Sequence, residues 1–342
     1  MKIAIDVMGG DNAPLAPIHG GYLAAEAYQA EILLVGDQEQ IEKILRENGW
    51  ETPKAGKLTV VHAPELVGMD DDPARVLRQK PNSSMAVALG LVRDGEADAI
   101  VSAGSTGALL SGATLICKRI RGIRRGALAP VIPSSSGQVM LVDAGANTDC
   151  TPEYLLQFAY MGSLYMEKIN GVKKPRVGLV NNGTEESKGD ALHRETYALL
   201  KEAGEAGRIH FVGNVEGRDV PLGGCDVAVC DGFSGNILLK TVEGVAKFMS
   251  GELKKMFTKN LATKLSYLIC KDGMDELRGL FDQDRVGGAP FLGIGHPVIK
   301  AHGSSNEIAF MNAVRQAVAY QESGMIEQIR KNIDHITVEK HL

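Results

Sequence analysis

The chain has 342 residues, of which 44% are hydrophobic and 23% are charged, and its formal net charge at pH 7 is −5. This composition is typical of a water-soluble globular protein. The negative charge argues against nucleic acid as a partner, because phosphate contacts need a basic face. No stretch reaches the roughly 18 apolar residues of a membrane-spanning helix. Asp6 interrupts the only apolar run near the N-terminus, so we expect no signal peptide.

Five scattered cysteines fit reduced thiols in a cytoplasmic protein better than a disulfide framework. Cys225 and Cys230 lie close together in sequence, but no second pair supplies the other ligands of a metal site. We therefore expect no metal site.

Short β-branched runs alternate with helical periodicity along the chain. The predicted strands cover residues 2–8, 31–36, 58–63, 97–103, 138–144, 175–181, 209–215 and 226–231. The predicted helices include residues 15–28, 38–48, 83–94, 106–120, 152–169, 190–204, 234–257 and 304–322. This alternation, with strands that are almost continuously apolar, predicts a three-layer α/β/α sandwich around one mostly parallel sheet. No long linker interrupts the pattern, so we expect a single domain over residues 1–342.

Five predicted strands end in short loops that are rich in glycine, hydroxyl groups and amides. In chain order the loops read "GGDNAP", "GSTGALL", "GANTD", "NGTEESKGD" and "GFSGN". Ligands of such sheets bind at the carboxyl ends of the strands. Glycine lets the backbone approach a ligand closely, and N–H groups at a helix start attract anions. The loops therefore predict a site for a small oxyanion at one end of one sheet.

The strongest phosphate-loop candidate consists of Gly104, Ser105, Thr106 and Gly107, within "SAGSTGALL". The alternative is a plain helix cap, because Ser and Thr favour that position. The loop is neither a Walker motif nor a dinucleotide fingerprint, which disfavours ATP and NAD as ligands. We expect no cofactor.

Two further loops carry charged or polar candidates. Lys188 in "NNGTEESKGD" can neutralise phosphate or a developing oxyanion, or it is a solvated surface lysine. Asp231, Ser234 and Asn236 in "DGFSGN" are candidate ligand contacts at the start of a long helix. The alternative is that Ser234 or Asn236 only caps that helix, while Asp231 orients a neighbour or holds a positive group.

The segment "PVIKAHGSSN" supplies Lys300 and His302. Repulsion from a neighbouring lysine would hold a histidine partly neutral, so His302 is a candidate general acid or base; the alternative is a histidine that is hydrogen-bonded within the fold. The sequence shows no Gly-x-Ser-x-Gly elbow, so no acyl-enzyme nucleophile is visible. Direct attack of a bound oxyanion on an acyl donor needs none.

Residues 241–271 form a lysine-rich amphipathic segment, with six lysines against one acid between Lys247 and Lys271. Such a stretch can lie on an anionic bilayer or bind an acidic carrier protein. The alternative is a helical pair whose apolar stripe packs on the core or across a dimer. We expect a helical segment over 241–285, which can protrude toward a membrane or a second subunit, with candidate carrier or membrane contacts at Lys254, Lys255, Lys259, Leu261 and Leu265.

Eight segments in this order resemble the bacterial phosphate acyltransferase family, the acyl-acyl-carrier-protein:phosphate transacylases of phospholipid synthesis. They are "IDVMGGDNAP", "NSSM", "SAGSTGALL", "DAGANTD", "NNGTEESKG", "FVGNVEGRD", "DGFSGN" and "PVIKAHGSS". Three of them add Asp11, Ser83 and Asn147 as candidate phosphate contacts. Ser105 stands where we expect asparagine in the family pattern, and Asn182 where valine is more common.

The resemblance implies a fold similar to isopropylmalate dehydrogenases and phosphotransacetylases, usually found as a homodimer. It implies transfer of a long-chain acyl group from acyl-carrier protein to inorganic phosphate. The acyl-phosphate then passes to a membrane glycerol-3-phosphate acyltransferase. The family is cytoplasmic and peripheral at the membrane. The alternatives are a phosphotransacetylase that uses short acyl-coenzyme A, a dehydrogenase of similar fold, or a non-catalytic membrane-binding scaffold.

Overall fold

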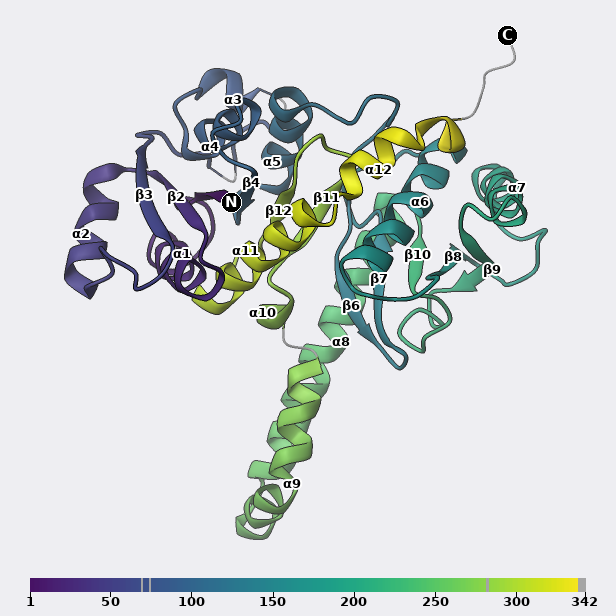
Figure 1. Ribbon diagram of the computed structural model, residues 1–342. Helices are drawn as coiled ribbons and strands as arrows, with labels where there is room; N and C mark the ends of the chain where they lie inside the picture. The colour runs from purple at the N-terminus through teal and green to yellow at the C-terminus, as the bar shows by residue number, and fades with distance from the viewer. Residues whose placement is uncertain (69, 74, 281–282, 338–342) are drawn as a thin grey trace.

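The computed structural model describes residues 1–68, 70–73, 75–280 and 283–337 (Figure 1). Its strands form a seven-stranded sheet with the order β3-β2-β1-β4-β12-β11-β5 and a five-stranded sheet with the order β6-β7-β10-β8-β9. The expected α/β class is confirmed, but the strands are divided between two sheets rather than forming one.

The seven-stranded sheet is parallel except at β11, which runs antiparallel to both of its neighbours. Its strands are β1 (Lys2–Asp6), β2 (Glu31–Gly36), β3 (Lys57–His62), β4 (Ala99–Ser102), β5 (Ala127–Leu128), β11 (Ala289–Leu292) and β12 (Val298–Lys300). Our sequence analysis missed β5, β11 and β12, because they are short and lie among loop residues.

The five-stranded sheet is parallel except for the β6–β7 hairpin. Its strands are β6 (Val131–Ser134), β7 (Gly137–Val142), β8 (Arg176–Asn181), β9 (His210–Glu216) and β10 (Val227–Val229). The segment from β5 to β6 joins the two sheets. Ala129 N donates to Pro290 O in β11, whereas Leu141 N in β7 donates to Pro130 O. This change of partner within two residues divides the strands into two sheets.

Helices cover both faces of the sheets. They are α1 (Leu15–Tyr28), α2 (Gln38–Asn48), α3 (Val76–Gln79), α4 (Ser84–Arg93), α5 (Thr106–Gly112) with a π-helical turn (Ala113–Cys117), α6 (Pro152–Lys168), α7 (Ala191–Glu205), α10 (Gln283–Val286), α11 (Glu307–Glu322), α12 (Met325–Lys331) and a final 3₁₀ turn (Ile333–Ile336). The predicted helix 106–120 thus changes its winding after Gly112 and ends at Cys117.

Strand β1 shows why the sequences of the strands are almost continuously apolar. Ile3 and Ile5 belong to the core that includes α1 and α11, whereas Ala4 lies in the core under α4 and α5. Successive side chains of a strand point to opposite faces, and both faces are covered here.

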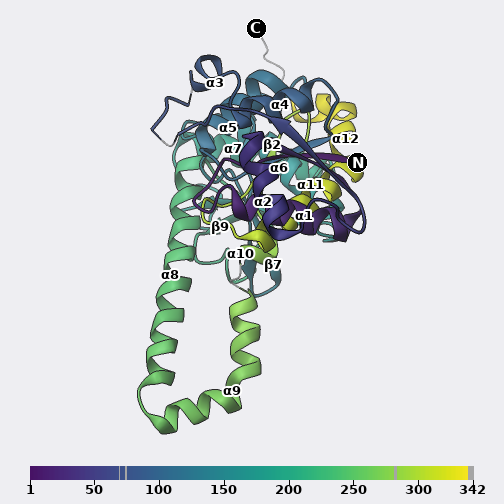
Figure 2. The ribbon, with the colours of Figure 1, turned by 90° about the vertical axis from the view of Figure 1, so that its left-hand side faces the viewer.

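Two helices leave the body of the protein. Figure 2 shows α8 (Gly232–Thr258) and α9 (Leu261–Leu280) as a long hairpin that extends away from both sheets. The segment 241–285 was expected to be helical; residues 281–282 of it lie outside the described residues.

Candidate active site

The carboxylate of Asp6, the last residue of β1, holds three segments together at the end of the seven-stranded sheet. It accepts hydrogen bonds of 2.6 Å from Ser84 Oγ in α4 and 2.6 Å from Ser102 Oγ at the end of β4. Burial raises the pKa of Asp6, and the two serine hydroxyls act in the opposite direction. Our sequence analysis did not assign Asp6 to the site, although an acid inside an apolar strand is the signal for a buried polar network.

The predicted phosphate loop 104–107 lies between β4 and α5. Ser105 is the N-cap of α5, and its Oγ accepts a hydrogen bond of 3.5 Å from Ala108 N. Gly104 N donates to Ser102 Oγ at 3.1 Å, so the loop is tied to the Asp6 network. The Ser105 hydroxyl therefore caps α5, which was the alternative interpretation of this loop. The cap lies within the same loop as the other candidate phosphate contacts.

The loops after β1, β4 and β12 touch one another. A Cβ atom on Gly9 would lie 2.7 Å from Gly104 N, which is closer than real Cβ atoms approach. Asp11 N donates a hydrogen bond of 2.7 Å to Gly303 O. The glycines are needed here because the backbones of three loops share one small space.

Lys300 ends β12 beside this cluster. Its ammonium group is buried and donates to Ala103 O at 3.3 Å. Burial lowers the Lys300 pKa to about 8, against the attraction of the nearby Asp6 carboxylate. His302 lies two residues further on, where its exposed Nδ1 is 2.9 Å from Ser304 Oγ. The structure therefore brings Lys300 and His302 to the loops that carry Asp11 and Ser105.

Ser83, a candidate phosphate contact, is the N-cap of α4. Its Oγ donates to Lys80 O at 2.8 Å and accepts from Ala86 N at 3.4 Å. The residue is buried and its hydroxyl is engaged on both sides, so Ser83 caps α4 directly before Ser84.

On the five-stranded sheet, the buried Asp143 organises the loop that contains Asn147. Its carboxylate accepts hydrogen bonds from Leu128 N at 2.9 Å, Ala146 N at 3.1 Å and Asn147 N at 2.6 Å. Asn147 Nδ2 donates to Asp143 at 2.9 Å and to Gly126 O at 2.8 Å. The Asn147 amide nitrogen is thus used to hold the loop, and burial raises the pKa of Asp143.

Asp231, Ser234 and Asn236 meet this loop at the start of α8. Asp231 is the N-cap and accepts from Ser234 N at 2.9 Å and from Ser234 Oγ at 2.8 Å. Gly232 N donates to Asn147 O at 2.7 Å. The cap of α8 is therefore Asp231 and not Ser234 or Asn236, which lie inside the helix, and the loops after β7 and β10 form one cluster.

Lys188 lies in the loop after β8, with its side chain 46% exposed and its Nζ 3.9 Å from Glu185 Oε1. Asn181 Nδ2 donates to Lys188 O at 3.2 Å, which ties the loop to its strand. Across the described ranges, no hydrogen bond or ion pair connects the Lys188 side chain to the loops after β1, β4 or β12.

Loops that follow strands of both sheets line a pocket of about 420 Å³. Gly107 lines it from the loop after β4, and Asn147 lines it from the loop after β7. Besides burial, the charge of Lys240 on α8 contributes to lowering the Lys300 pKa. Among the described residues, no group of three His, Cys, Asp or Glu side chains is arranged to hold a metal ion.

A family model described as "Fatty acid synthesis protein" matches residues 1–328 of the chain. The phosphate acyltransferase of Thermoanaerobacterium thermosaccharolyticum is 45% identical over 336 residues, which cover 98% of both chains. That of Pelotomaculum thermopropionicum is 47% identical over 339 residues, which cover 99% of this chain and 96% of the relative. This chain belongs to the phosphate acyltransferase family. The resemblance in the eight segments is confirmed, and the protein is an acyltransferase.

Solved phosphotransacetylases have a fold similar to that of this phosphate acyltransferase. The phosphotransacetylase EutD from Staphylococcus aureus matches with a TM-score of 0.59 and 16% identity over 94% of both chains. A phosphotransacetylase from Streptococcus pyogenes matches with a TM-score of 0.58 and 20% identity over 94% of both chains. At these identities the likeness concerns the fold alone, and it confirms the expected fold class.

The α8–α9 hairpin of this phosphate acyltransferase exposes its apolar stripe. The side chains of Met249, Leu261 and Leu265 are 50%, 75% and 56% exposed. The interpretation that the stripe packs on the core is therefore wrong for most of its length. Val242 at its start packs against the core, whereas the helices beyond it extend away from the sheets (Figure 2). No helix in the described part of the chain is long and apolar enough to cross a membrane.

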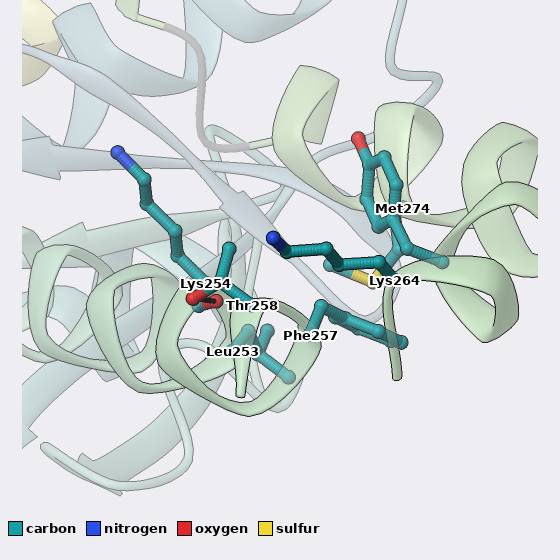
Figure 3. Close-up of a pocket in the computed structure, with 7 residues that line it drawn as sticks. Leu253, Lys254, Phe257, Thr258, Lys264 and Met274 are labelled. Atoms are coloured by element: carbon teal, nitrogen blue, oxygen red, sulfur yellow. Dashed lines mark hydrogen bonds between the residues drawn. The ribbon is translucent and has the colours of Figure 1, made fainter. Parts of the chain in front are cut away.

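A second pocket, of about 250 Å³, lies between α8 and α9. Figure 3 shows Lys254, Phe257 and Lys264 around it, and the Phe257 ring meets the Tyr267 ring edge to face at 5.4 Å. The two helices thus contact each other through aromatic side chains. Lys254, Lys255 and Lys259 are exposed, and Lys254 also borders the pocket.

Proposed function

We propose that this phosphate acyltransferase transfers a long-chain acyl group from acyl-carrier protein to inorganic phosphate, and that the acyl-phosphate enters phospholipid synthesis. The observation that carries the proposal is the buried Lys300, whose pKa of about 8 suits proton transfer near neutrality. It stands where three strand-end loops meet. The kinship with phosphate acyltransferases and the lack of a nucleophile motif support direct attack by phosphate.

In the proposed reaction, a phosphate oxygen attacks the carbonyl carbon of the thioester. A carbon–oxygen bond forms and negative charge collects on the carbonyl oxygen. N–H groups of the loop 104–107 and the Lys188 ammonium group stabilise that charge. When the intermediate collapses, the carbon–sulfur bond breaks and the thiolate leaves. Lys300 or His302 gives the thiolate a proton, since a thiol has a pKa of about 8.5.

The remaining candidate residues have two proposed roles, contact with phosphate and support of the loops. Phosphate contacts come from Gly104, Thr106 and Gly107 in the first cluster and from Asn236 and Ser234 in the second. Asp11, Asn147 and Asp231 support these loops through the hydrogen bonds described above.

The test incubates the purified protein with palmitoyl-acyl-carrier protein, with and without inorganic phosphate, and follows free carrier thiol and acyl-phosphate. We expect thiol release that depends on phosphate and matches the acyl-phosphate formed. Palmitoyl-coenzyme A at the same concentration is the control donor. Release without phosphate would indicate a thioesterase, and equal rates with both donors would favour the phosphotransacetylase alternative; either result contradicts the proposal.

The hairpin gives this enzyme a surface for its lipid product. The exposed Leu261 and Leu265 can enter the apolar boundary of a bilayer, while Lys254, Lys255 and Lys259 meet anionic headgroups. On this proposal the enzyme is cytoplasmic and peripheral at the membrane, where it delivers acyl-phosphate to a membrane glycerol-3-phosphate acyltransferase. We further propose that residues 1–342 form one catalytic domain with a protruding hairpin, and that two copies associate as a homodimer.

A further inference from the structure

Two arginines that our sequence analysis did not assign line the pocket between the two sheets. Arg119 follows the π-helical turn, and Arg125 precedes β5. They belong to the run "KRIRGIRR" over residues 118–125, which contains five basic residues and no acid. The same pocket is bordered by Gly107 and Asn147, so the arginines lie beside the proposed reaction site.

Both guanidinium groups are held in place by partners that carry no charge. Arg119 Nη1 donates to the backbone carbonyl of Arg124. Arg125 Cζ lies 5.5 Å from the centre of the Tyr154 ring, in a cation–π contact. By contrast, Arg124 Nε is 3.1 Å from Glu153 Oε1. Within the described ranges neither Arg119 nor Arg125 has a carboxylate partner, so their charges are oriented and available to an anion.

The rest of the pocket combines hydroxyl groups with an apolar wall. Ser111 and Thr114 line it from α5 and the turn that follows, and Leu110 and Leu115 add apolar surface. Its volume of about 420 Å³ is within the range of small-molecule sites, roughly 300–1,000 Å³, and exceeds what inorganic phosphate alone would fill. The pocket therefore suits a longer ligand with an anionic group and an apolar part.

We propose that Arg119 and Arg125 bind the phosphodiester of the phosphopantetheine arm of the acyl donor. The inference rests on the proposed function, in which the donor is acyl-carrier protein. That arm carries a phosphodiester at one end, a dimethyl group next to it and the thioester at the other end. Arginine forks match phosphate oxygens, and the leucines match the methyl groups. The thioester then extends toward the loop that contains Gly107.

The test compares two small donors, octanoyl-phosphopantetheine and octanoyl-pantetheine, which differ only in the phosphate. For the unmodified enzyme we expect a KM about tenfold or more lower for the phosphorylated donor, because a phosphate paired with arginine adds charge-assisted hydrogen bonds. Arg119→Gln and Arg125→Gln should each reduce this ratio severalfold and leave the KM for inorganic phosphate unchanged. Arg121→Gln, an exposed arginine of the same run outside the pocket, is the matched control and should keep the ratio.

Two results would overturn the inference. One is an equal KM for both donors in the unmodified enzyme. The other is a raised KM for inorganic phosphate in the Arg119 and Arg125 variants with an intact donor ratio, which would place the co-substrate in the pocket. Thermal unfolding of each variant verifies that it is folded.

A binding measurement separates this inference from the proposed function. Calorimetric titration with phosphopantetheine and with pantetheine needs no turnover. If the protein forms no acyl-phosphate from any donor, the proposed function fails. The pocket inference then still requires tighter binding of phosphopantetheine, and loss of that preference in Arg119→Gln. Equal binding of the two compounds would refute it.

Discussion

The Asp6 carboxylate accepts a hydrogen bond of 2.6 Å from the hydroxyl of Ser102, a residue 96 positions further along the chain. A second bond from Ser84 joins α4 to the same carboxylate. Through this one side chain the fold aligns the ends of two strands and the start of a helix, and the proposed phosphate loop is bonded to that arrangement through Gly104.

Removal of the Asp6 carboxylate should destabilise the protein. Asp6→Ala leaves the Ser84 and Ser102 hydroxyls without their acceptor, and a buried unsatisfied group costs about 1–3 kcal/mol. Asp6→Asn should cost less, because its amide oxygen still accepts one bond. Urea denaturation measures both. Asp94→Ala, which removes an exposed ion pair with Arg93, should cost no more than about 1 kcal/mol; an equal loss in the two alanine variants would refute the role of the network.

Lys300 should make the stability depend on pH. Its pKa is about 8 in the folded protein and 10.5 at its ordinary value. Between these pH values the unfolded chain binds more protons than the folded one, so the free energy of unfolding should rise as pH increases from 8 toward 10.5. Lys300→Met should remove this rise. Urea denaturation at pH 7, 8, 9 and 10, in steps of about one unit, measures the free energy of unfolding of both proteins, and a shift of one pKa unit corresponds to about 1.4 kcal/mol.

The same group should shape the pH dependence of the reaction. If protonated Lys300 gives its proton to the thiolate, kcat/KM should fall above about pH 8. Lys43→Met, on the exposed side of α2, should keep this limb of the profile. A Lys300→Met enzyme with an unchanged profile would assign the proton to another group, and His302→Gln would then be measured in the same way.

Lys188→Ala should lower kcat about 10²-fold without a change in stability, because oxyanion donors supply about that factor. Lys201→Ala is a matched control: its side chain is 49% exposed, against 46% for Lys188, and it pairs with Glu186 as Lys188 lies near Glu185. Steady-state kinetics with acyl-acyl-carrier protein as the donor measure kcat for both variants. If Lys188→Ala stays within a few-fold of the unmodified enzyme, the oxyanion role is wrong.

Gly9→Ala should lower the activity because it displaces the loops after β1 and β4. The added Cβ would lie 2.7 Å from Gly104 N and 2.8 Å from Asp6 Oδ2, so the loops after β1 and β4 must separate. Misplacement of a site by about 1 Å can cost about 10²-fold in rate. Gly90→Ala, in α4, adds a Cβ that meets no described atom within 4 Å apart from its chain neighbours and the backbone of its own helix. It should keep full activity and stabilise the helix by roughly 0.5–1 kcal/mol.

The hairpin lysines should control binding to anionic vesicles. A triple Lys254→Glu, Lys255→Glu, Lys259→Glu variant loses about 1 kcal/mol per lysine, which amounts to roughly 100-fold or more in partitioning. Flotation with phosphatidylglycerol vesicles measures the loss of binding. Flotation with uncharged vesicles shows how much of the binding is electrostatic. The same change at exposed lysines away from the hairpin should keep flotation; suitable positions are Lys43, Lys173 and Lys201. Flotation that survives in the hairpin variant would favour the dimer interpretation of this surface.

The local pattern of the sequence determined much of the fold. The alternation of apolar strands and amphipathic helices predicted β1, β2 and their helices almost to the residue, because Ile3, Ala4 and Ile5 are buried on two faces. The cap at Ser105 was also visible, since a cap acts on N–H groups two or three residues away. At α8 the cap is Asp231 rather than the expected Ser234 or Asn236. The eight ordered segments were enough to predict the family.

Only the tertiary structure decided which of these residues meet. The Asp6–Ser102 bond and the lowered pKa of Lys300 depend on strand order and burial, which no local pattern encodes. The division into two sheets follows from the change of partner at Ala129, and residues of both parts, Gly107 and Asn147, line one pocket. The direction of the hairpin was equally undetermined, because an amphipathic stripe has the same sequence pattern whether it covers a core or faces solvent.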